Sequence, residues 1–353
     1  MNFKKTFIDT LDFKKAENPP ICEFMKFWPE TNELYKDKTG GGSLIKHFGL
    51  GEIEYHHINF SFYPPFERMQ IEDGGDWEII RDFDGITKKV IKNSSAMPHY
   101  IDFPIKNRAD FEKLREEKHN ALDKGRYPED FETYIKDIQN TDTVYGFVTA
   151  GMFAFMRDNI DFETLMMMFY DEEDLVAEMA MEQANFVISL WERALQNYVP
   201  DFVYFGEDMA YKSGPMISPS MVEKIIAPGW DKVISFLKSK GVKNIVLDSD
   251  GNIDDILPIA LECGFNTVLP LERTAGMDAE TLRKRYPDLR MIGGVDKLRI
   301  AEGKTAIEEE IKKAVRVYKT GGYIPSFDHS VPPIVSYENY KYYIERLKEE
   351  LSK

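Results

Sequence analysis

Five short apolar runs in the second half of the chain each end in a polar or glycine-containing cluster, and helical stretches separate the runs. The runs are Val203 to Asp208, Ile245 to Gly251, Val268 to Glu272, Met291 to Gly294 and Tyr323 to His329. In a closed barrel of parallel strands, the carboxyl ends of the strands meet at one mouth, where catalytic side chains gather. The pattern therefore predicts an α/β barrel with one site at its mouth.

The same alternation of strand and helix begins before these runs. We expect a strand over 143–149 and a long helix over 172–198, followed by helices that start at Ser218 and near Ser336. Repeated strand and helix units with short links indicate a parallel sheet. Because the chain has no glycine-rich dinucleotide fingerprint, the pattern favours a barrel over an open Rossmann sheet.

The first third of the chain has a different pattern. We expect a helix within 3–16, strands over 21–25 and 55–63, and a hairpin over 77–90 around Asp84 and Gly85. An Asp-Gly pair accommodates the positive φ angles of a tight hairpin turn. We predict one domain over 1–353, in which 1–106 form an N-terminal helical and hairpin extension with the first elements and 107–353 form the main barrel.

The composition excludes some classes of partner. Lys and Arg total 45 against 61 Asp and Glu, a formal net charge of −16, which disfavours nucleic acid because DNA and RNA binding requires a local excess of cations. No apolar run approaches the length of a membrane span, and no signal-peptide pattern follows the N-terminus. We expect a cytoplasmic protein without membrane contact, whose two cysteines are reduced.

Asp248 and Asp250 are the leading candidates for chemistry. Alternation along a strand places both carboxylates on one face, where they could bind a cation or share a proton. Gly251 then allows the backbone to turn. An ordinary turn and helix cap at Asp250 is the alternative interpretation.

His329 follows the last apolar run and precedes two prolines. Its imidazole could donate or accept a proton or bind a metal, although a histidine after a strand is often only structural. Glu207 and Asp208 end another run and are further catalytic candidates. Gly293 and Gly294 are candidate cofactor-binding positions.

At these residues the chain resembles the uroporphyrinogen decarboxylase superfamily. Its members are (β/α)₈ TIM-type barrels and include uroporphyrinogen decarboxylases and zinc methyltransferases that act with corrinoid proteins. Leu247 to Gly251 falls where the methyltransferases carry Leu-His-x-Cys-Gly, and His329 falls on their third zinc ligand. The resemblance thus implies a metal site of Asp248, Asp250 and His329. Two carboxylates and an imidazole suit zinc first, and also iron or manganese.

The match to the decarboxylases is poorer at their functional positions. Their arginine-rich segment corresponds to Phe24 to Glu30 here, where one arginine becomes Lys26 and the second becomes Glu30. Their essential aspartate falls at Phe62 and their active-site tyrosine at Phe155. The cation formed in that decarboxylation needs a nearby anion, and an apolar ring cannot supply one.

The resemblance implies a methyltransferase of one-carbon metabolism as the first hypothesis. A metal would activate a small thiol-like acceptor, and a partner protein would supply a methylated corrinoid. Glu207, Asp208, Asp248 and His329 would be the catalytic residues. A decarboxylase of uroporphyrinogen or another acid, with no cofactor, is the second hypothesis. A non-catalytic corrinoid-binding or tetrapyrrole-binding protein is the third. A homodimer is expected in each case.

Overall fold

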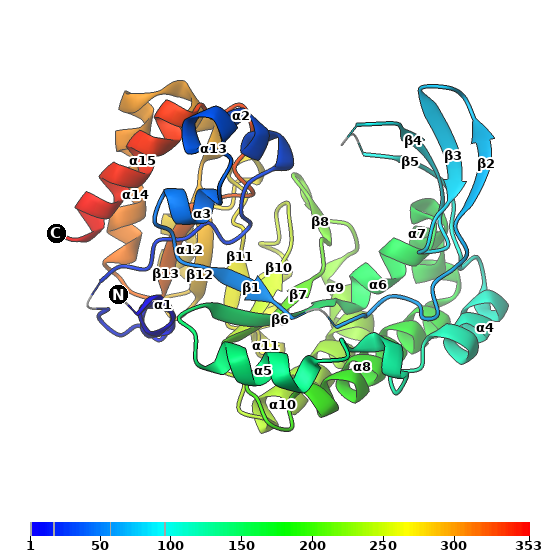
Figure 1. The fold of residues 1–353 in the computed structure, drawn as a ribbon. Coiled ribbons are helices and arrows are strands. Elements are labelled where there is room, and N and C mark those ends of the chain that lie inside the picture. Colours follow the sequence, from blue (N-terminus) through cyan, green and yellow to red (C-terminus); the bar gives the residue numbers. More distant parts are fainter. Residues whose placement is uncertain (1, 17, 57, 95–96) are drawn as a thin grey trace.

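The structure, a computed structural model, describes residues 2–16, 18–56, 58–94 and 97–353. Its centre is a curled parallel sheet of a TIM-type barrel, with helices on the outside (Figure 1). The strands follow one another in the order β1 (Ile53–Tyr55), β6 (Val144–Ala150), β7 (Phe202–Gly206), β10 (Ile245–Asp248), β11 (Thr267–Leu269), β12 (Arg290–Val295) and β13 (Tyr323–Phe327). The five apolar runs are thus the strands β7 and β10–β13, as predicted.

Alternation along the strands separates an interior layer from an exterior layer. Val246 and Leu269 pack inside the barrel with Phe202, Ile292 and Ile324. Residues two positions further along a strand face the same side. The next inward residue of β10 after Val246 is therefore Asp248, at the carboxyl end of the strand.

Helices cover the outer face of the sheet. They include α5 (Phe131–Gln139), α8 (Glu173–Ala194), α10 (Ala227–Ser239), α11 (Leu257–Cys263), α12 (Ala279–Arg285), α13 (Lys297–Glu302), α14 (Lys304–Tyr318) and α15 (Tyr337–Leu351). The predicted helix starts are confirmed at Ser218 and Ser336, whose side chains cap α9 (Pro219–Met221) and α15. A π-helical turn (Val222–Ile226) joins α9 to α10. The predicted helix 172–198 is α8.

The N-terminal segment closes the gap between β1 and β13. Gly51 N–H donates to Ile21 O at 2.8 Å, and on the other side Glu23 Oε2 accepts from Phe327 N–H at 2.9 Å. Cys22 and Phe24 fill the barrel interior between them. The predicted strand 21–25 is wrong, because these residues form no regular backbone ladder with β13. The Glu23 side chain accepts the hydrogen bond from β13 that a neighbouring backbone would accept.

Other elements precede or follow this segment. They are α1 (Phe3–Leu11), α2 (Pro29–Thr39), α3 (Leu44–His47), α4 (Arg108–Lys118), α6 (Met152–Asn159), α7 (Phe162–Asp171), the hairpin β8 (Ala210–Tyr211) and β9 (Gly214–Pro215), and the 3₁₀ turns Lys124–Arg126 and Arg273–Ala275. The predicted strand 55–63 is wrong beyond Tyr55. There Asn59 Oδ1 accepts from Ser61 N–H at 2.9 Å, which turns the chain out of the sheet.

An antiparallel sheet projects from the barrel as an arm. Its strands are β2 (Met69–Asp73), β3 (Trp77–Arg81), β4 (Thr87–Ile91) and β5 (His99–Asp102), in that order. The predicted hairpin is confirmed as β3 and β4, with Trp77 opposite Ile91. The arm and the strands β11–β13 lie on opposite sides of the view in Figure 1. Within the described residues, no helix is both long enough and apolar enough to cross a bilayer.

Candidate active site

Asp248, Asp250 and His329 all lie at the carboxyl-terminal mouth of the barrel. His329 Nε2 lies 3.7 Å from Asp250 Oδ2, so the predicted meeting of the β10 and β13 ends is observed. The Trp28 ring stands edge-on to the imidazole, with the ring centroids 6.4 Å apart. His329 therefore faces the Asp250 loop and does not point into bulk solvent.

Asp248 is held inside the barrel by a tyrosine. Its side chain is buried, and Oδ2 accepts a hydrogen bond from the Tyr204 hydroxyl of the neighbouring strand. Oδ1 is buried without a hydrogen-bond partner. Burial raises the pKa of Asp248 well above its usual range, the charges of Asp208 and Asp250 add to this, and the tyrosine bond opposes it. Asp248 is thus a carboxyl group whose neutral form is favoured.

The loop after β10 presents Asp250 to the mouth. Gly251 adopts φ +80°, and a Cβ there would lie 2.4 Å from Ala210 O, so only glycine fits. Gly251 N–H donates to Glu272 Oε2 at 3.0 Å. Burial raises the pKa of Asp250, His329 lowers it, and the charges of Asp208 and Glu272 raise it further. The result is a half-exposed carboxylate with increased basicity.

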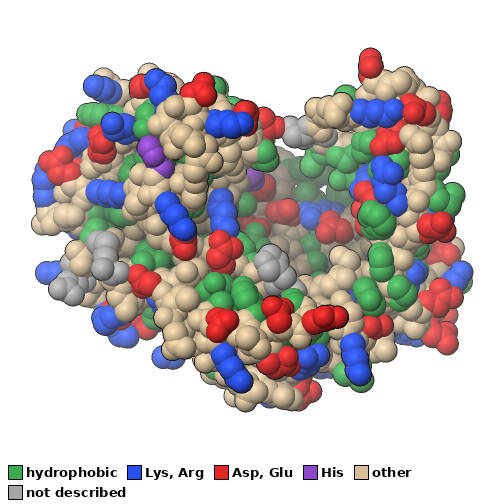
Figure 2. Space-filling view, in the orientation of Figure 1, with side chains coloured by type: hydrophobic (Ala, Val, Ile, Leu, Met, Phe, Trp, Pro, Cys, Tyr) green, Lys and Arg blue, Asp and Glu red, His purple; other side chains and the backbone are tan. Residues whose placement is uncertain are grey.

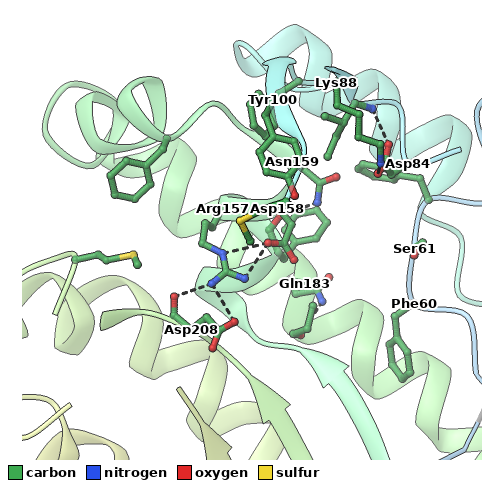
Figure 3. A pocket seen from close by; sticks show the side chains of 18 of the residues that line it. Phe60, Ser61, Asp84, Lys88, Tyr100, Arg157, Asp158, Asn159, Gln183 and Asp208 are labelled. Carbon is green, nitrogen blue, oxygen red and sulfur yellow. Dashed lines mark hydrogen bonds and ion pairs between the residues drawn. The ribbon is translucent and has the colours of Figure 1, made fainter. Parts of the chain in front are cut away.

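Asp208 connects this cluster to the next strand. Its Oδ1 accepts from Asp250 N–H at 3.3 Å, and its Oδ2 lies 3.5 Å from Arg157 on α6. Arg157 also pairs with Asp158 at 2.9 Å (Figure 3). Burial disfavours the charged guanidinium, but Asp158 and Asp208 raise the pKa of Arg157 overall. Arg157 is therefore a fixed cation between two carboxylates.

A cavity of about 770 Å³ extends from Asp208 to the arm. Figure 2 shows the hollow between the barrel and the arm, with hydrophobic side chains along its walls and charged side chains at its floor. On the barrel side it is lined by Ala150, Arg157 and Asp158, and on the arm side by Asp84 and Lys88. The cavity has the size and position of a substrate site at a barrel mouth.

Glu207 lies outside this cluster. Its carboxylate accepts hydrogen bonds from the N–H groups of Met152, Phe153 and Ala154 at 2.8–3.1 Å, and from the Trp230 indole. These amides form the N-terminus of α6, where a negative charge is favoured. Burial raises the pKa of Glu207, and the four hydrogen bonds oppose this shift. Both oxygens are engaged, so Glu207 anchors the helix that carries Arg157.

Gly293 and Gly294 satisfy local backbone requirements. Both have positive φ, and a Cβ at Gly293 would lie 2.1 Å from Pro270 O. Gly294 N–H donates to the same carbonyl at 2.9 Å. The expected role in cofactor binding stays a prediction.

The predicted metal ligands do not form a coordination group as they are arranged. Asp248 Oδ2 is engaged with the Tyr204 hydroxyl, and Asp250 Oδ2 faces His329 Nε2 at 3.7 Å. Across the described ranges, no set of three or more His, Cys, Asp or Glu side chains is placed to hold a metal ion. The metal site that the resemblance implies stays a prediction.

Three contributors to the site were missed as site residues. Tyr204 alternates with the inward-facing Phe202, so strand periodicity alone could have identified it. Arg157 and Asp158 sit at the end of α6, two turns after β6, and no local pattern distinguishes them from surface charges. They become site residues only because the arm completes the cavity that they line.

A family model described as uroporphyrinogen decarboxylase matches residues 85–350. The chain belongs to this family. A solved structure of a methyltransferase from Methanosarcina mazei is similar over 99% of both chains, with a TM-score of 0.61 and 16% identity. A B12-independent methionine synthase from Shewanella sp. W3-18-1 covers 96% of this chain and 95% of its own, at 13% identity and a TM-score of 0.41. Among curated proteins, no sequence matches.

This member of the uroporphyrinogen decarboxylase family has an apolar wall at the two positions where the resemblance places the decarboxylases' aspartate and tyrosine. Phe62 and Phe155 are both buried, line the cavity and contact each other edge-on, with centroids 6.1 Å apart. Lys26, which the resemblance places at a decarboxylase arginine, pairs with Glu54 at 3.1 Å. These positions thus hold packed rings and an ion-paired lysine.

Proposed function

We propose that this chain is a methyltransferase that moves a methyl group from a methylated corrinoid protein to a small thiol-like acceptor. The proposal rests on the geometry of the mouth. Asp250 and His329 face each other, and Asp208 connects this pair to a large cavity with aromatic walls. The full-length neighbour named a methyltransferase supports methyl as the transferred group. The partner protein and the homodimer remain parts of the proposal.

Asp250 is the proton acceptor in this reaction. Its raised pKa makes it a stronger base than an ordinary carboxylate, and nearly half of its side chain is exposed to the mouth. The acceptor thiol gives its proton to Asp250, and His329 at 3.7 Å stabilises the charges on the loop. The sulfur then forms a bond to the methyl carbon, while the electron pair of the broken carbon–cobalt bond stays with cobalt.

The charges of the mouth argue against the decarboxylase alternative. A substrate with many carboxylates requires free cations, but three of the four candidate cations, Lys26, Arg157 and Arg273, each contact an acidic side chain. The fourth, Lys212, is exposed on the turn between β8 and β9. Asp208, Asp250 and Glu272 would in addition repel such a substrate. The third hypothesis, corrinoid binding without turnover, is an outcome of the test below.

Anaerobic incubation with methylcobalamin and 2-mercaptoethanol tests the proposal. Loss of the methylcobalamin absorbance together with formation of the methyl thioether is the expected result. Asp250→Asn should slow the reaction about 100-fold, the lower range for a general base. Asp288→Asn, the same chemical change at an exposed residue before β12, should have no effect. A spectral shift without any thioether would instead indicate binding alone, and carbon dioxide release from uroporphyrinogen would favour the decarboxylase.

A further inference from the structure

The cavity combines aromatic walls with carboxylates. Its aromatic lining includes Phe60, Phe62, Phe103, Phe155, Phe162 and Tyr211. The faces of such rings carry partial negative charge and attract organic cations. Sulfonate and carboxylate groups gain nothing from the same surface.

The cations that line the cavity are already neutralised. Lys88 on the arm lies 2.8 Å from Asp82 and 3.0 Å from Asp84, and its side chain is only 13% exposed. Arg157 at the barrel end lies between Asp158 and Asp208 (Figure 3). Neither group is available to bind an anionic substrate without breaking an existing ion pair.

Negative charge accumulates at the end of the cavity that meets the barrel mouth. Asp208 lines the cavity, and its Oδ1 accepts from Asp250 N–H at 3.3 Å, which brings the two carboxylates close together. Glu272 lies behind them, with its carboxylate on Gly251 N–H. Against these acids stand His329 and two ion-paired cations, Arg157 and Lys297. A ligand cation near Asp208 would relieve this excess.

We propose that the small acceptor of this enzyme carries a positively charged ammonium group, which Asp208 and the aromatic walls bind while its thiol points to Asp250. The proposal rests on the proposed function for the reaction, but its charge preference can be measured without turnover. It excludes an anionic thiol as the preferred acceptor.

Three thiols that differ chiefly in charge test the preference. Cysteamine, 2-mercaptoethanol and 2-sulfanylethanesulfonate share a two-carbon chain and end in an ammonium, a hydroxyl and a sulfonate. At equal thiolate concentration with methylcobalamin, kcat/KM should fall in that order, with cysteamine at least about tenfold above the sulfonate. A preference for the sulfonate, or no preference, would overturn the inference and leave the methyltransferase proposal standing.

Binding of non-reacting ligands separates the two proposals. By calorimetry, choline should bind at least about tenfold more tightly than isethionate, its anionic counterpart. If choline binds selectively but no thiol is methylated, the proposed function fails and the charge preference stands. If isethionate binds as well as choline, the charge preference fails whatever the thiols do.

Variants locate the selectivity in the cavity. Asp208→Asn should reduce the ratio of choline to isethionate affinity about fivefold or more, whereas Asp288→Asn should leave it unchanged. Tyr211→Leu should weaken choline binding about threefold, while Tyr211→Phe, which retains the ring, should not. Circular dichroism of each variant checks that it is folded. Selectivity unaffected by both Asp208→Asn and Tyr211→Leu would overturn the assignment to this cavity.

Discussion

Replacing Glu207 with glutamine distinguishes an anchoring role from a catalytic role. Each of the two carboxylate oxygens accepts two hydrogen bonds: Oε1 from Met152 N–H and the Trp230 indole, and Oε2 from Phe153 and Ala154 N–H. An amide presents one oxygen and one NH₂ group. Whichever way the amide is oriented, two buried N–H donors then face another donor.

The expected loss of stability follows from those two donors. A buried donor left without an acceptor costs about 1–3 kcal/mol, so the two together cost about 2–6 kcal/mol. The negative charge at the N-terminus of α6 is lost as well, which adds to the cost. A loss of this size is large for a single substitution, most of which cost about 0.5–3 kcal/mol.

Urea unfolding followed by circular dichroism at pH 8 measures the effect. Glu207→Gln should lower the midpoint clearly, whereas Glu192→Gln, at an exposed position on α8, should leave it within error. Because α6 carries Arg157, weaker acceptor binding should accompany the loss of stability. An unchanged midpoint together with a collapse of kcat would refute the anchoring role and return Glu207 to the catalytic residues.

Three further experiments test buried and mouth-facing groups. Burial raises the pKa of Glu23 from 4.5 to about 7, so its contribution to stability is complete below pH 4.5 and falls by roughly 3 kcal/mol as the pH rises through 7. Glu23→Gln should remove this part of the pH dependence in urea titrations at pH 5 and 8. If the variant keeps the same dependence of stability on pH, the carboxyl is ionised in the native protein. Tyr204→Phe leaves the Asp248 carboxyl without its hydrogen bond and should cost about 1–3 kcal/mol in thermal unfolding; full stability would mean that Asp248 has another partner. Elemental analysis should find less than one equivalent of zinc, iron or manganese in both the native chain and the Asp248→Ala, Asp250→Ala double variant. A stoichiometric metal that only the native chain retains would contradict the arrangement of Asp248, Asp250 and His329 described above.

The barrel could be predicted because its strands carry strong local signals. Val246 and Leu269 lie in short apolar runs with glycine or polar ends, and each run became a strand. The segment around Glu23 has a similar apolar pattern but makes no ladder, because a side chain supplies its hydrogen bonds to β13. That exchange depends on a residue 304 positions away and has no local signature.

The site could be predicted only where strand ends define it. Asp250 and His329 meet because parallel strands present their carboxyl ends at one edge. Glu207 ends a strand in the same way, yet it turns toward the amides of α6, and a glycine at 151 makes room, since a Cβ there would lie 1.9 Å from the Glu207 carboxyl carbon. The direction of a side chain after a strand end depends on such neighbours. Neither the composition of the sequence nor its periodicity identifies these neighbours.

The closure of the barrel by residues 21–24 has a consequence during synthesis. Phe24 N–H donates to the Ser326 hydroxyl, a contact between residues 302 positions apart, so the ring of strands stays open until nearly the whole chain has left the ribosome. Until then residues 21–24, which lie beside β1, have no neighbour on the side that β13 takes. A protein trimmed before Trp28 would keep both sheet borders uncovered and should self-associate through them.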